Sequence, residues 1–92
     1  MGLTVSKNED VHWKLIEEMA VLLNADEGVV LQLDLVGTRI WLNIDGKKNG
    51  HDLVAVITTD FDVQTERAEK DVRKFLKRLS KDEAIQLGNR TL

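Results

Sequence analysis

The prediction of the fold rests on residues 29–44, which read VVLQLDLVGTRIWLNI. In the first half of this stretch, apolar and polar residues alternate, as they do in a strand with one buried face. The alternation changes parity at Gly37, and a parity change at a glycine indicates a tight turn or a bulge. We therefore expect two antiparallel strands joined by a hairpin turn at residues 36–38. On the second strand, Ile40 would face inward and Trp41 outward.

A third strand is expected at residues 53–59. The segment before it, residues 45–52, is polar and contains two glycines, which is typical of a turn. Residues 53–59 are rich in β-branched side chains and are apolar on both parities. This strand would therefore be the most buried of the three, or would pack at an interface.

Two helices are expected to flank the three strands. Ser6 and Glu9 have the spacing of a capping box, and the helix behind them would end near Asn24. Asp62 would cap the second helix. In both segments the apolar residues recur at helical spacing. They are Leu15, Ile16, Met19, Leu22 and Leu23 in the first segment, and Ala68, Val72, Phe75, Leu76 and Leu79 in the second.

The predicted architecture is a single α+β domain spanning residues 1–92, with the element order α-β-β-β-α. A chain of 92 residues has room for one hydrophobic core. The two amphipathic helices would pack on one face of a three-stranded antiparallel sheet and leave the other face open. Residues 1–5 and 89–92 are expected to be frayed.

The composition argues against catalysis. The chain has no cysteine, which excludes disulfides, thiol catalysis and thiolate metal sites. His12 and His51 lack metal-ligand spacing, and no serine lies in a G-x-S-x-G elbow. We expect no enzymatic activity, metal, cofactor or small-molecule substrate. The absence of a secretory signal or a long apolar run predicts a cytoplasmic location.

The open sheet face is the predicted protein-binding site, and Trp41 is its centre. Tryptophan is costly to expose and is enriched at the centres of protein interfaces. The alternative is that Trp41 lies across a neighbouring strand and covers it. The predicted contact residues are Trp41, Arg39, Asn43, Gln32 and Asp34.

A basic run on the second helix suggests a different partner, RNA. These side chains could contact phosphates, although a helix dipole also favours cations near its C-terminal end. The run comprises Arg73, Lys74, Lys77, Arg78 and Lys81.

The α-β-β-β-α order is similar to that of double-stranded RNA-binding domains and of the small Alu-domain subunits of the signal recognition particle. The second likeness rests on residues 53–57 followed by a helix containing residues 75–79. It implies a sheet that holds RNA. The sequence departs from this pattern at Gln32 and Asp34, where a basic sheet would need lysine or arginine.

The first six residues match the N-myristoylation pattern M-G-x-x-x-[ST] and resemble the start of ADP-ribosylation factors. The resemblance implies acylation of Gly2 and, through the acyl chain, contact with a membrane. The competing role of Ser6 is to cap the first helix.

Together these features predict a non-catalytic protein–protein interaction module, either a small adaptor or an inhibitor. It would bind a partner, or a second copy of itself, through its open sheet face or a free strand edge. A homodimer that pairs edge strands is the simplest version. The alternatives are an RNA-binding domain and an N-myristoylated peripheral membrane adaptor.

Overall fold

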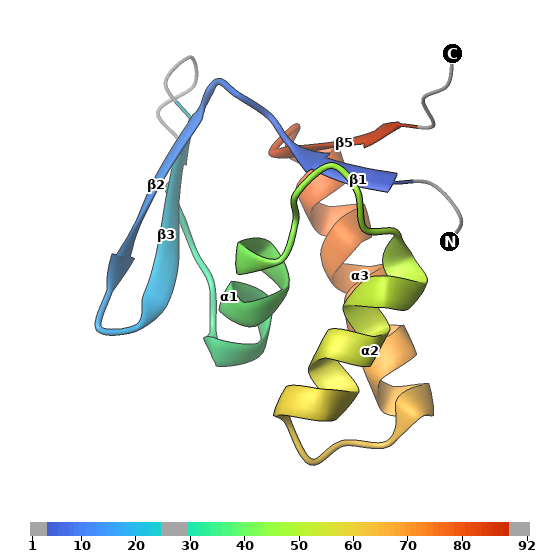
Figure 1. Ribbon diagram of the computed structural model, residues 1–92. Coiled ribbons are helices and arrows are strands. Elements are labelled where there is room, and N and C mark those ends of the chain that lie inside the picture. Colours follow the sequence, from blue (N-terminus) through green and yellow to red (C-terminus); the bar gives the residue numbers. More distant parts are fainter. Residues whose placement is uncertain (1–3, 25–29, 89–92) are drawn as a thin grey trace.

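The computed structural model describes residues 4–24 and 30–88. Within these residues the chain forms a sheet layer and a helix layer (Figure 1). The elements in chain order are β1 (Thr4–Lys7), β2 (Val11–Ile16), β3 (Met19–Asn24), β4 (Val30–Gln32), α1 (Leu35–Leu42), α2 (Gly50–Asp60), α3 (Thr65–Lys81) and β5 (Ile85–Gly88).

The main sheet has three antiparallel strands in the order β2-β3-β4. Leu22 on β3 lies opposite Trp13 on β2 and Leu31 on β4, so these three side chains share one face of the sheet. Leu22 is buried, and this face is turned toward the helices (Figure 1). The first and last strands, β1 and β5, pair antiparallel in a separate two-stranded sheet.

The core lies between the sheet and the helix layer. Helix α2 packs along α3, and α1 contacts both α2 and β3. Buried side chains of this core come from β1, β2, β3, β5 and the three helices, so residues from both sheets take part. The largest side chains with almost no exposed surface are Trp41, Ile40, Leu53, Ile57, Leu79, Val5 and Val72.

The first predicted helix is wrong: its residues form the β2–β3 hairpin. Ile16 pairs with Met19 at the end of the hairpin, across a turn made by Glu17 and Glu18. Both glutamates have positive φ, 52° and 71°, as a tight two-residue hairpin turn requires. Glutamate is not a usual residue for this backbone conformation, so the sequence carries no turn signal here.

The hairpin predicted at residues 36–38 is also wrong, because these residues lie in helix α1. The Asp34 carboxylate caps this helix by accepting a hydrogen bond from the Gly37 amide at 2.7 Å. A Cβ atom at Gly37 would lie 3.0 Å from Cε1 of Phe75 on α3. The glycine therefore permits close approach of α1 and α3, and its presence does not indicate a turn.

The third predicted strand is helix α2. Asn49 and Asp52 form a reciprocal capping box at its start, with both hydrogen bonds at 3.0 Å. Leu53 and Ile57, one turn apart, are both buried. Tertiary packing against α3 here overrides the strand preference of the β-branched side chains.

The broader prediction is confirmed: the chain is a small α+β domain with an antiparallel sheet. Helix α3 matches the predicted second helix, and Ala68, Val72 and Leu79 are buried as its periodicity indicated. The predicted cap is wrong, because Gln64 and not Asp62 is the N-cap residue, and its side chain makes no capping hydrogen bond. The α-β-β-β-α order is wrong. Residues 4 and 5, expected to be frayed, belong to β1, while residues 1–3 and 89–92 lie outside the described residues.

Candidate functional site

Strand β4 has an open edge. The Leu33 amide donates a hydrogen bond to the Ala20 carbonyl at 2.8 Å, and Leu31 lies opposite Leu22 on β3. Because backbone polar groups alternate in direction along an antiparallel strand, the N–H and C=O of Gln32 point away from β3. In the described part of the chain, no strand pairs with this side of β4. The edge is therefore available to a further strand.

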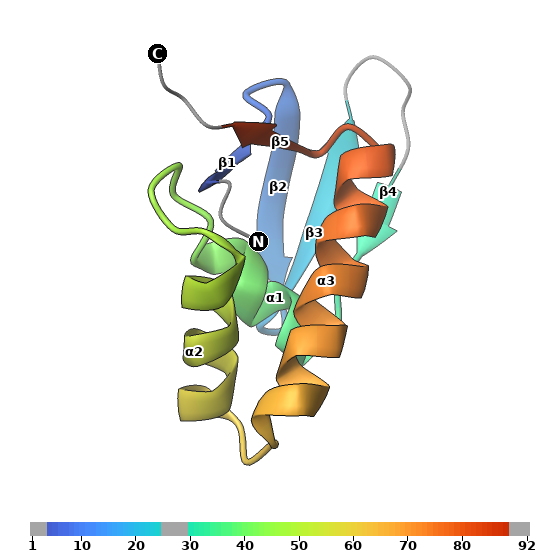
Figure 2. The same ribbon diagram turned by 90° about the vertical axis from the view of Figure 1, so that its right-hand side faces the viewer.

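A hollow of about 520 Å³ lies between α3 and the junction of β4 with α1. In the view of Figure 2, α3 lies over the side of the sheet that ends in β4. We call this space the β4 hollow. It is lined by Asp34, Val36, Gly37, Ile40, Arg67, Asp71, Lys74, Phe75 and Arg78.

The β4 hollow combines an apolar floor with a cationic rim. Val36 and Phe75 are half-buried and pack against the hydrophobic core. The Asp34 carboxylate is occupied by its capping bond, and Asp71 accepts hydrogen bonds from Nε of Arg67 at 3.3 and 3.4 Å. Lys74 and Arg78, by contrast, form no ion pair with any described residue. The rim thus offers two cations to an incoming acidic or carbonyl group.

The predicted open sheet face centred on Trp41 is wrong in its location. Trp41 lies in helix α1, where it is fully buried. Arg39, on the same helix, is exposed and pairs with Asp60 at 3.5 Å. The Asn43 side chain donates a hydrogen bond to the Arg39 carbonyl at 2.8 Å. The strand prediction failed because the capping role of Asp34 was not recognised.

Gln32 and Asp34, predicted on the same face as Trp41, lie instead at the open edge of β4 and at the β4 hollow. Gln32 is exposed on β4, and Asp34 follows two residues later. Two of the five predicted protein-binding residues are therefore brought together, whereas Arg39, Trp41 and Asn43 lie elsewhere. The binding role of all five stays a prediction.

The structure divides the predicted phosphate-contacting residues between two faces of α3. Lys74 and Arg78 line the β4 hollow, while Arg73, Lys77 and Lys81 line a second hollow near β1 and β5. Each set recurs at intervals of four residues, the spacing at which helical side chains share a face. The sequence prediction grouped all five as one run.

Several residues of the β4 hollow were missed by sequence reasoning. Phe75 was assigned only to the core, and Gly37 was interpreted as a turn. The spacing of Arg67, Asp71 and Lys74 on one helical face was the available signal. It becomes informative only once β4 and α1 are known to lie beside that face.

No group of three or more metal-binding side chains occurs within residues 4–24 and 30–88. The same residues contain no helix of the length and apolarity that a bilayer span needs. Gly2, the predicted acylation site, lies outside the described residues.

An open strand edge beside a lined hollow is typical of protein-binding domains of the α+β class. A model of the family described as Coenzyme PQQ synthesis protein D (PqqD) matches residues 19–85. The chain belongs to this PqqD family. No curated protein matches the chain.

Two solved structures share the fold. One is TbiB1 in complex with the TbiA(beta) leader peptide, with a TM-score of 0.81 and 29% identity, covering 94% of this chain and 99% of that one. The other is a lasso peptide synthetase B1 complexed with the leader peptide, with a TM-score of 0.79 and 17% identity, covering 89% and 96%. The descriptions of these proteins mention neither RNA, nor acylation, nor a homodimer. Those alternatives remain predictions without support from relatives.

Proposed function

We propose that this chain is a recognition module for the leader peptide of a ribosomally made precursor, such as a lasso peptide precursor. The observation that carries the proposal is the open edge of β4 beside the β4 hollow. The relative that is 29% identical over nearly its whole length is described in complex with a leader peptide. In this role the chain binds the peptide and makes or breaks no bond in it.

The backbone of the leader peptide would add to the sheet as a strand next to β4. Its amide and carbonyl groups would pair with the C=O and N–H of Gln32, which point away from β3. In this mode the backbone hydrogen bonds supply affinity and pockets for alternate side chains supply specificity. Every second side chain of the peptide would point toward the helix layer, where the β4 hollow lies.

The residues that line the β4 hollow determine which peptide side chains it would bind. The half-buried surfaces of Val36 and Phe75 would take an apolar anchor. Lys74 and Arg78 would pair with an acidic residue of the peptide, since neither forms an ion pair with a described residue. The preferred ligand is thus an extended segment with an apolar residue and a nearby carboxylate.

The variant Gln32→Pro tests the proposed strand pairing. Proline removes the outward N–H and places its ring in the path of the added strand, but breaks no hydrogen bond to β3. The matched control is Gln32→Val, which alters the same side chain and keeps the N–H. Binding of fluorescein-labelled leader peptides from lasso precursors, beginning with the TbiA(beta) leader, would be measured by fluorescence anisotropy.

We expect saturable binding to the parent chain and to Gln32→Val, and a loss of at least about tenfold in affinity with Gln32→Pro. Circular dichroism would establish that both variants retain the parent fold. Equal binding by both variants would disprove addition to β4. Absence of binding across the whole panel of leader peptides would contradict the proposed function itself.

A further inference from the structure

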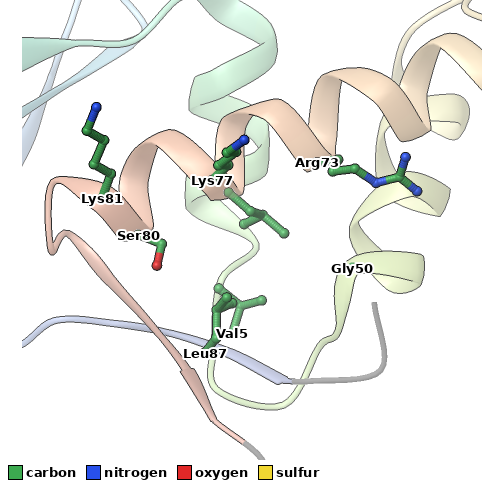
Figure 3. Close-up of a pocket in the computed structure, with 8 residues that line it drawn as sticks. Val5, Gly50, Arg73, Lys77, Ser80, Lys81 and Leu87 are labelled. Atoms are coloured by element: carbon green, nitrogen blue, oxygen red, sulfur yellow. The ribbon is translucent and has the colours of Figure 1, made fainter.

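The second face of α3 borders another hollow, of about 600 Å³, between this helix and the strands β1 and β5. We call it the β1–β5 hollow. Figure 3 shows Val5 and Leu87 pointing from the two strands toward α3. The cavity is lined by Val5, Gly50, Arg73, Leu76, Lys77, Ser80, Lys81 and Leu87.

The floor of the β1–β5 hollow is apolar. Val5 on β1 and Leu76 on α3 are almost fully buried beneath it. Leu87 on β5 is 45% exposed, which is high for a leucine whose side chain points toward a packed helix. Burial of this exposed surface under another apolar side chain would lower the free energy of the complex.

The rim of the β1–β5 hollow is cationic. Arg73, Lys77 and Lys81 follow one another at intervals of one helical turn and are all exposed. None of them forms an ion pair with a described residue, and the described residues that line the cavity include no carboxylate. This surface contrasts with the chain as a whole, which has a net charge of −3.

The helix dipole does not account for two of the three cations of this rim, Arg73 and Lys77. Its stabilising effect on cations is confined to the last turn of a helix, which here contains Arg78 and Lys81. Arg73 and Lys77 lie further toward the N-terminus of α3. Glu69, one turn before Arg73, forms no ion pair with it in the described structure. These two cations therefore remain available to a ligand.

We propose that the β1–β5 hollow is a second docking site, which binds a short acidic segment of a partner protein. The carboxylates of the segment would pair with Arg73 and Lys77, and one large apolar side chain would cover Leu87. Charge complementarity selects this partner, since the described residues around the apolar recess include three cations and no acid. The site lies on a different face of α3 from the β4 hollow, so both can be occupied together.

The test begins with a phage-displayed library of random short peptides selected on the whole chain. Selection against the double variant Arg73→Glu/Lys77→Glu removes peptides that bind elsewhere. The selected peptides would then be synthesised and titrated into the ¹⁵N-labelled chain. The matched control is Lys74→Glu/Arg78→Glu, which makes the same change in charge on the other face of the same helix.

We expect peptides rich in aspartate and glutamate around one large apolar residue, with chemical-shift changes centred on Leu76, Lys77 and Leu87. The Arg73→Glu/Lys77→Glu variant should weaken binding by about a hundredfold and Leu87→Ala by about tenfold. The control double variant should bind as the parent chain does. The affinity for a leader peptide, measured separately, should be unchanged in Arg73→Glu/Lys77→Glu, so this proposal can fail independently of the proposed function.

Three results would overturn the proposal. The first is the recovery of peptides without acidic residues, or of no peptides at all. The second is chemical-shift changes confined to the β4 hollow. The third is binding of phosphatidylglycerol vesicles that depends on Arg73 and Lys77 while the acidic peptides do not bind, because the occupant would then be a lipid surface.

Discussion

The indole ring of Trp13 on β2 stands nearly perpendicular to that of Trp41 in α1, with ring centroids 5.9 Å apart and an interplanar angle of 84°. The Nζ atom of Lys7 lies 5.3 Å from the Trp13 centroid and 5.1 Å from the Trp41 centroid. Lys7 also donates a hydrogen bond to the Ile44 carbonyl at 3.0 Å. This cluster joins β1, the β2–β3 hairpin and α1, and it is a structural centre of the domain.

Replacement of Trp41 should destabilise the fold. Trp41→Ala would leave a large cavity in the core, and we expect a loss of about 3–5 kcal/mol in the free energy of unfolding. Trp41→Phe should cost less, because the phenyl ring fills more of that cavity. Both variants remove the buried indole N–H, which has no hydrogen-bond partner among the described residues. Urea denaturation of both variants measures the difference. Full stability of Trp41→Ala would contradict the buried position.

The stability of the domain should depend on the charge of Lys7. Burial lowers the pKa of Lys7 below its usual 10.5, an effect that the nearby Asp45 carboxylate partly opposes. Between the lowered pKa and 10.5 the unfolded chain binds more protons, so this lysine makes folding more favourable as the pH rises. The uncharged variant Lys7→Met should lack this increase. Urea denaturation of both proteins from pH 8 to pH 10.5 measures this difference. If the free energy of unfolding changed with pH in the same way in both proteins, the prediction would be wrong.

Asp45 should stabilise the loop before α2 only when ionised. Its carboxylate accepts hydrogen bonds from Nζ of Lys48 at 2.8 Å and from the amides of Lys47 and Lys48 at 2.9 and 3.0 Å. These bonds hold the pKa of Asp45 well below its usual 3.8. The stabilisation is therefore complete above that value and is lost as the pH falls further.

The variant Asp45→Asn tests this dependence. We expect it to melt at a lower temperature than the parent chain at pH 7, with the difference narrowing as the pH falls below 3.8. Thermal denaturation followed by circular dichroism measures the gap. A gap that stays constant over this range would show that the charge of Asp45 has no part in it.

The cationic rim of the β4 hollow should contribute to leader-peptide binding. The variant Lys74→Glu/Arg78→Glu reverses both unpaired cations, so we expect affinity to fall by about tenfold or more. Binding to the parent chain should also weaken with added salt, and the variant should show less of this dependence. Anisotropy titrations at low and moderate salt test both points. Equal affinity of variant and parent chain would assign recognition to the apolar floor alone.

The sequence predicted part of the fold and little of the candidate site. Helix α3 was predicted because its apolar residues repeat at the helical period, which is a local property. The β2–β3 hairpin was not predicted. Its apolar residues suit either a helix face or two short strands, and its turn uses Glu17 and Glu18 in place of glycine or asparagine.

By itself the sequence determined the α+β class, the amphipathic helix α3 and the exclusion of cysteine chemistry. The tertiary structure decided that residues 50–60 are helical, because packing against α3 outweighs the strand preference of their side chains. It also decided which cations on α3 face β4 and which face β1 and β5. Both surfaces bring together side chains far apart in the chain, and only the packing of the elements places them side by side.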